Sequence, residues 1–70
     1  MNRPEAQPFC LVPLELELSF AASDWRQDPV GLCRGALAAH GEPLRWAITA
    51  AEARPGHRQW LRLEAVVLVP

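Results

Sequence analysis

The most constraining feature of the chain is its C-terminal half, where two apolar-rich stretches flank the turn sequence Arg54-Pro55-Gly56-His57. Proline followed by glycine favours a tight turn, so this half predicts an antiparallel pair of strands. In the strand after the turn, residues 59–69, the odd positions are apolar from Leu61 onward. The even positions Val66 and Leu68 are apolar too. A chain of 70 residues has little interior, and burying Val or Leu contributes about 1.5–3 kcal/mol. A strand that is apolar on both faces therefore predicts self-association or docking onto a partner.

The rest of the chain predicts one more strand and one helix. Residues 14–20 alternate Leu or Phe with Glu or Ser, the period of a strand with one dry face. Residues 21–27 are expected to form a connection. Asp28-Pro29 then predicts a helix start, because Asp caps free amides and Pro suits the first helical position, and Gly41 predicts its end. The residues expected on the apolar side of this helix are Val30, Cys33, Leu37 and His40.

These elements predict one α+β domain over residues 9–70, with the order β-α-β-β. We expect a three-stranded, mostly antiparallel sheet with one helix packed on it, the second strand covering residues 44–51. Residues 1–8 are polar and contain two prolines, which predicts a flexible N-terminal arm. Pro13 lacks an amide donor, so it should lie at the start of its strand or on a sheet edge. Gly31 and Gly35 form a smooth stripe that predicts close approach to the sheet or to a neighbouring chain.

Charge and composition favour a cytoplasmic protein that binds neither nucleic acid nor membranes. The formal net charge is -1, with acids and arginines interspersed, so there is no basic patch for an anionic polymer or surface. No apolar run approaches the roughly 20 residues that span a bilayer, and residues 1–8 lack the apolar stretch of a signal peptide. Cys10 and Cys33 are expected to stay reduced thiols, with a disulfide as the open alternative.

Catalytic and metal-binding residue patterns are sparse. His40 is expected near the C-terminus of the helix, where it would stabilise the helix dipole, and His57 falls in the turn. Two histidines and two cysteines without clustered spacing make a poor zinc site. No pairing of a nucleophile with a base is visible. The sequence therefore predicts a non-enzymatic protein without a metal, and an enzyme would need a site shared between subunits.

Tryptophan is the unusual residue of this chain, with three copies and no tyrosine. Tryptophan is favoured at the energetic centres of protein interfaces and as a stacking surface for planar ligands. We therefore expect an interaction or assembly module that forms a homo-oligomer or docks on a larger protein. In the competing explanation, Phe9, Leu11 and Val12 of the same chain cover Val66 and Leu68, and no partner is needed. The residues predicted to form the interface are Trp46, Trp60, Arg62, Val66 and Leu68.

The chain also resembles the dodecins, small flavin-binding proteins with the same order of strands and helix. The resemblance rests on Ser23-Asp24-Trp25 before the helix, Leu44-Arg45-Trp46 at the second strand and Leu61-Arg62-Leu63-Glu64 in the third. It implies a hollow dodecamer that stores a flavin such as FMN or riboflavin, with Trp46 stacked on the flavin ring. Arg62 stands where that family has its flavin-bonding glutamine. Flavin binding through Trp46 and Arg62 is thus the alternative function.

Overall fold

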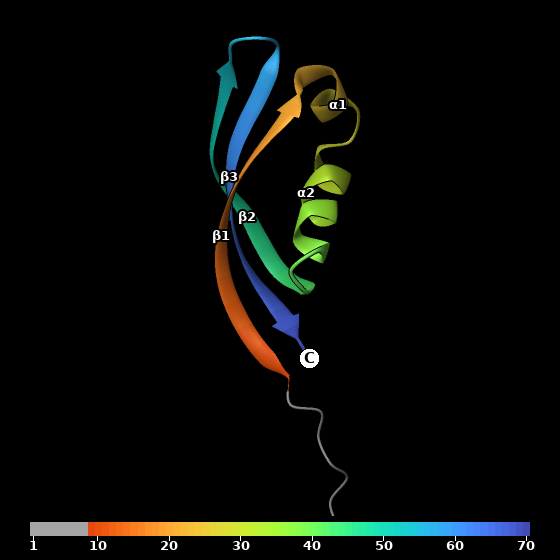
Figure 1. Ribbon diagram of the computed structural model, residues 1–70, viewed down its shortest axis with the longest axis vertical. Helices are drawn as coiled ribbons and strands as arrows, with labels where there is room; N and C mark the ends of the chain where they lie inside the picture. Colours follow the sequence, from red (N-terminus) through yellow and green to blue (C-terminus); the bar gives the residue numbers. More distant parts are fainter. Residues whose placement is uncertain (1–8) are drawn as a thin grey trace, which may run out of the picture.

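The computed structural model describes residues 9–70, which form a three-stranded sheet and two short helices (Figure 1). The central strand β3 is antiparallel to both neighbours, so the strand order is β1-β3-β2. The α+β class and the antiparallel sheet are therefore confirmed, whereas the predicted arm at residues 1–8 lies outside the described residues. The elements are β1 (Cys10–Ala21), α1 (Ala22–Gln27), α2 (Pro29–Ala38), β2 (Glu42–Arg54) and β3 (Arg58–Val69).

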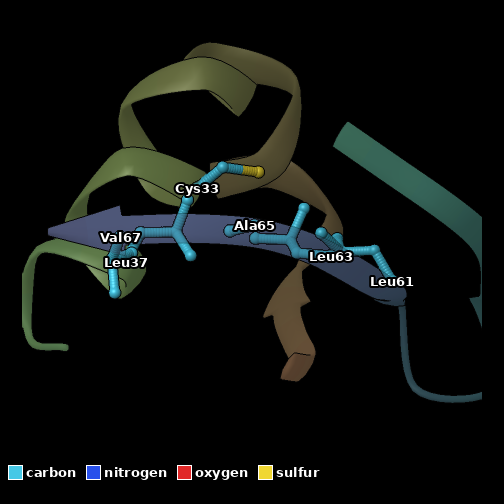
Figure 2. Close-up of a cluster of buried hydrophobic side chains, with 6 residues drawn as sticks. All are labelled: Cys33, Leu37, Leu61, Leu63, Ala65 and Val67. Atoms are coloured by element: carbon cyan, nitrogen blue, oxygen red, sulfur yellow. The ribbon is translucent and has the colours of Figure 1, made fainter. Parts of the chain in front are cut away.

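Both helices lie on one side of the twisted sheet, and the core forms between α2 and β3 (Figure 1). Figure 2 shows Cys33 and Leu37 of α2 beside the side chains that β3 directs towards the helices. Successive strand residues point to opposite faces, so the odd positions of β3 form this core and its even positions face away. The fully or nearly fully buried residues are Cys33, Leu37, Leu61, Leu63, Ala65 and Val67.

Helix α2 begins as predicted and is shorter than predicted. The Gly31 amide donates to the Asp28 carboxylate over 3.0 Å, and Pro29 occupies the first helical position. The helix ends at Ala38, and both Val30 and His40 are exposed. The prediction that these two share the buried side with Cys33 and Leu37 is wrong, because His40 lies beyond the end of the helix and Val30 lies in its first turn, outside the core.

Residues 21–27 contain a helix rather than the expected connection. The Ala22 amide donates to the His57 carbonyl over 2.7 Å, which fixes the start of α1 to the turn between β2 and β3. The rings of Phe20 and Trp25 are stacked, with centroids 6.0 Å apart. No side chain caps this helix at Ala21. Tertiary contacts therefore hold α1, and the local sequence carries no start signal.

Strand β2 is irregular, and this changes which side chains share a face. The register against β3 shifts between Pro43 and Arg45 and again between Ile48 and Ala50. Such bulges add a residue to one strand and interrupt its alternation. In a regular strand, Trp46, Ile48 and Ala50 would share one face. The second bulge instead places Ala50 opposite Arg62, on the other face of the sheet.

The two glycines of α2 do not form a common contact surface with the sheet. A Cβ added at Gly31 would overlap the Asp28 carboxylate, whereas one added at Gly35 would meet nothing within 4 Å. The predicted close approach to the sheet is therefore wrong for Gly35. Contact of Gly35 with a neighbouring chain stays a prediction. In the part of the chain described here, neither helix is long and apolar enough to cross a membrane.

Candidate interaction face

The face of the sheet opposite the helices is uncovered by any element of residues 9–70, and we call it the open face (Figure 1). Directly paired residues of antiparallel strands project to the same side, so the register against the even positions of β3 defines its members. They form three columns: Leu11, Pro13, Glu15, Glu17 and Ser19 on β1; Trp60, Arg62, Glu64, Val66 and Leu68 on β3; and Glu42, Arg45, Ala47, Ala50 and Glu52 on β2.

One end of the open face is apolar. Leu68 pairs with Leu11, and Val66 pairs with Pro13. Val66 and Leu68 are half-buried by their neighbours, and Leu11 is 64% exposed. Of the predicted covering residues, Leu11 lies beside this end, whereas Val12 pairs with Val67 on the helix side; Phe9 precedes β1 and is 53% exposed. The described residues therefore leave an apolar patch at this end without a cover.

The other end of the open face is charged and organised around Trp60. The guanidinium carbons of Arg54 and Arg62 lie 4.7 and 5.6 Å from the centre of the Trp60 ring. Cations over an aromatic face are attracted by its quadrupole. Arg54 also pairs with Glu52 over 3.0 Å. This end is therefore held together by contacts within the chain.

At the charged end, Arg58 of β3 forms hydrogen bonds to Ser19 of β1. Its Nε donates to the Ser19 hydroxyl over 3.1 Å, and its Nη2 donates to the Ser19 carbonyl over 2.9 Å. Two hydrogen bonds from one guanidinium fix its orientation. The side chain thus serves the sheet rather than a ligand.

A row of acidic residues separates the two ends. Glu15 and Glu64 are directly opposite each other on β1 and β3. Like charges in that position are destabilising unless a cation compensates them. Arg62 only partly does so, because its Nε lies 4.0 Å from the Glu15 carboxylate. The same Nε is buried and has no hydrogen-bond partner within residues 9–70.

A groove of about 550 Å³ crosses the sheet at this row. It lies where the apolar end meets the acidic row, so an occupant would contact both. No ion pair is formed by Arg45 or Glu64 within the described chain. The lining residues are Pro13, Glu15, Arg45, Ala47, Glu64 and Val66, whose side chains belong to the open face, together with Leu14, Trp46 and Ala65.

Four of the five residues predicted as an interface share the open face: Trp60, Arg62, Val66 and Leu68. Trp46 does not belong with them. It pairs with Ala65 and is half-buried against the core on the helix side. Because β3 is central and its odd positions face the helices, Trp46 and the other four residues lie on opposite faces, and a contact through Trp46 stays a prediction.

Sequence reasoning missed three functional candidates of the open face: Arg45, Glu15 and Glu64. Glu15 and Arg45 lie on the two edge strands, with β3 between them. The signal that would have found them is the strand order, since it decides which residues share a row.

The histidines and cysteines of the described residues do not form a cluster that could hold a metal ion. No three His, Cys, Asp or Glu side chains within 9–70 come together to hold a metal ion. His40 and His57 are both exposed, and Cys33 is buried while Cys10 is exposed. Burial raises the pKa of the Cys33 thiol, which disfavours the reactive thiolate.

The comparisons with known proteins place the chain in one family. The model of a domain of unknown function, DUF8621, matches residues 10–69. The chain belongs to the DUF8621 family. The matched residues run from the start of β1 to the end of β3, so the DUF8621 domain includes the whole sheet, both helices and the open face. No curated protein and no solved structure matches the chain.

Proposed function

We propose that this DUF8621 protein is a small non-enzymatic assembly module that self-associates through the apolar end of its open face. The observation that carries this proposal is the pairing of Val66 and Leu68 with Pro13 and Leu11 on a face that residues 9–70 leave uncovered. Contiguous exposed apolar patches mark interaction sites. Docking of the same face onto a larger protein is the second form of this function.

The proposal includes a cytoplasmic location. Cys10 and Cys33 are both free, with one thiol exposed and the other in the core. An exposed free thiol is compatible with a reducing compartment, where disulfides are rare.

The native mass of the purified protein tests the proposal. We expect a multiple of the 7.8 kDa chain by light scattering, and a single chain for Val66→Asp with an unchanged circular dichroism spectrum. Val30→Asp is the matched control, because Val30 is exposed on α2 and the same change there should leave the mass unaltered. A single-chain mass for the wild type at roughly 100 µM, well above a micromolar dissociation constant, would refute self-association. An unchanged mass for Val66→Asp would remove the open face from the contact.

Flavin binding of the dodecin type remains the alternative prediction. Trp46 and Arg62 lie on opposite faces of the sheet, so one chain does not bring them to the same side of a flavin ring. A flavin held by both residues would need at least two copies of the chain. Quenching of flavin fluorescence by the wild type but not by Trp46→Ala would support the alternative, and no quenching at micromolar protein would refute it.

A further inference from the structure

The open face fits a second copy of itself. We infer a two-fold dimer in which Arg45 of each copy enters the groove of the other and pairs with Glu15 and Glu64. This inference rests on the proposed function and names its partner, its symmetry and its recognition residues. It follows from three features of the described chain: interrupted sheet edges, opposite charges on the two outer strands beside the groove, and a groove lined by two unfavourably opposed carboxylates.

The β1 edge is closed to strand addition by Pro13. The Ala22 amide donates to the His57 carbonyl in continuation of the β1–β3 register. Hydrogen-bonded pairs alternate with non-hydrogen-bonded pairs along an antiparallel ladder. The backbone N–H and C=O groups of the even-numbered β1 residues therefore bond to β3, and those of the odd-numbered residues point away from β3, towards the free edge. Pro13 thus places its nitrogen, which has no proton, on the free edge, as predicted for an edge position. Edge prolines prevent pairing with another chain.

The β2 edge is closed in a different way. It carries Pro43 and two bulges, at the steps from Pro43 to Arg45 and from Ile48 to Ala50. Bulges twist an edge and interrupt the regular spacing that a further strand would need. With both edges interrupted, the open face is the surface that we assign to the association of two sheets.

The charges of the two outer columns are complementary beside the groove. There the β1 column contributes Glu15, whereas the β2 column contributes Arg45, which has no ion pair within residues 9–70. The two acids of the β2 column, Glu42 and Glu52, lie in the rows of Leu68 and Trp60, on either side of that position. A two-fold rotation about an axis parallel to β3 lays the β1 column of one copy over the β2 column of the other. Isologous contacts of this kind bring each pair together twice.

The rows of the sheet show what this rotation brings together. Arg45 shares a row with Val66 and Pro13, so it faces Pro13 of the other copy. Glu15 and Glu64 occupy the next row, two residues or roughly 7 Å along the strands. An arginine side chain spans that distance. Its stem covers Pro13 while its guanidinium reaches both carboxylates.

The groove provides space for the incoming Arg45 side chain. It has a volume of about 550 Å³ and lies between the apolar end and the row that holds Glu15 and Glu64. Guanidinium binds carboxylates through planar paired hydrogen bonds, so the incoming Arg45 compensates two like charges. The resulting contact has an apolar centre of Val66 and Leu68 with charged residues at its border, as in other protein interfaces.

Charge exchange between two variants tests the dimer. Arg45→Glu and Glu15→Arg each place like charges at both symmetric contacts, so we expect each variant alone to show the mass of a single 7.8 kDa chain. In an equimolar mixture, the two substituted positions face each other with opposite charges, and the native Glu15 and Arg45 form the second contact. We expect the mixture to regain twice the single-chain mass. Arg34→Glu, on the exposed surface of α2, should keep the wild-type mass.

Each other outcome overturns the inference, and Val66→Asp separates its failure from failure of the proposed function. An oligomer that ignores both charge variants but dissociates with Val66→Asp uses the open face in another arrangement. Variants that stay single chains when mixed refute the pairing of Arg45 with Glu15. A wild type that is a single chain overturns the dimer and self-association together. Circular dichroism of each variant checks that a lower native mass reflects dissociation of folded chains and not unfolding.

Discussion

Gly35 provides a direct test of how α2 is packed. Glycine inside a helix costs about 1 kcal/mol relative to alanine, and Gly35 lies within α2, between Pro29 and Ala38. An added methyl group would meet no atom within 4 Å, and Gly35 is exposed. Gly35→Ala should therefore stabilise the fold by about 1 kcal/mol. For a domain of this size that corresponds to a rise of roughly 4–8 °C in Tm.

Gly31→Ala is the matched control, because the same substitution in the same helix meets a different environment. Its methyl group would overlap the carboxylate of Asp28, which caps the helix by accepting from the Gly31 amide over 3.0 Å. Loss of such a cap costs about 1 kcal/mol, which offsets the gain in helix propensity. Gly31→Ala should leave the Tm unchanged or lower it.

Thermal unfolding followed by circular dichroism at one fixed protein concentration separates the two variants. The concentration is fixed because self-association shifts the apparent stability. We expect Gly35→Ala to unfold several degrees above Gly31→Ala. A destabilised Gly35→Ala, or one with an altered native mass, would refute the reasoning and place Gly35 against a neighbouring chain.

Two further predictions concern the core. Leu63 is fully buried, so Leu63→Ala should lower the free energy of unfolding by about 2–5 kcal/mol, whereas Val30→Ala at an exposed position of α2 should cost less than about 1 kcal/mol in the same urea titration. Burial raises the pKa of the Cys33 thiol above its ordinary value of 9.0, so the unfolded chain loses this proton first as the pH rises. The stability of the wild type should be unaffected by this group below pH 9 and fall above it; a Cys33→Ala variant with the same alkaline decline in Tm would contradict that assignment.

Much of the fold could be predicted because its signals are local. The alternation in residues 14–20 indicated the edge strand, since an edge strand with one dry face keeps a strict period of two. Asp28-Pro29 marked the start of α2, and Pro55-Gly56 marked the turn between β2 and β3. Each of these depends on residues that are neighbours in the sequence, so no knowledge of the packing was required.

The missed features depend on contacts that are distant in the sequence. Helix α1 is held by Trp25 stacked on Phe20 and by a hydrogen bond to the carbonyl of His57. The bulge before Ala50 and the orientation of Trp46 follow from pairing with β3. Four of the predicted interface residues share one face because the alternation of β3 is uninterrupted. The groove residues on β1 and β2 required the strand order, which no local pattern contains.

The order of apolar and charged side chains along β1 gives an independent argument that the apolar end of the open face forms a contact. Along β3 the open-face residues change from Arg62 and Glu64 to Val66 and Leu68. β1 runs the other way, and its open-face residues change in the opposite order along the sequence, from Leu11 and Pro13 to Glu15 and Glu17. The two changes therefore coincide in space. A strand preference for β-branched residues would explain Val66 alone, but it does not explain a leucine and a proline placed opposite the same end on a separate strand. A partner that covers this end of the open face would explain the apolar residues on both strands.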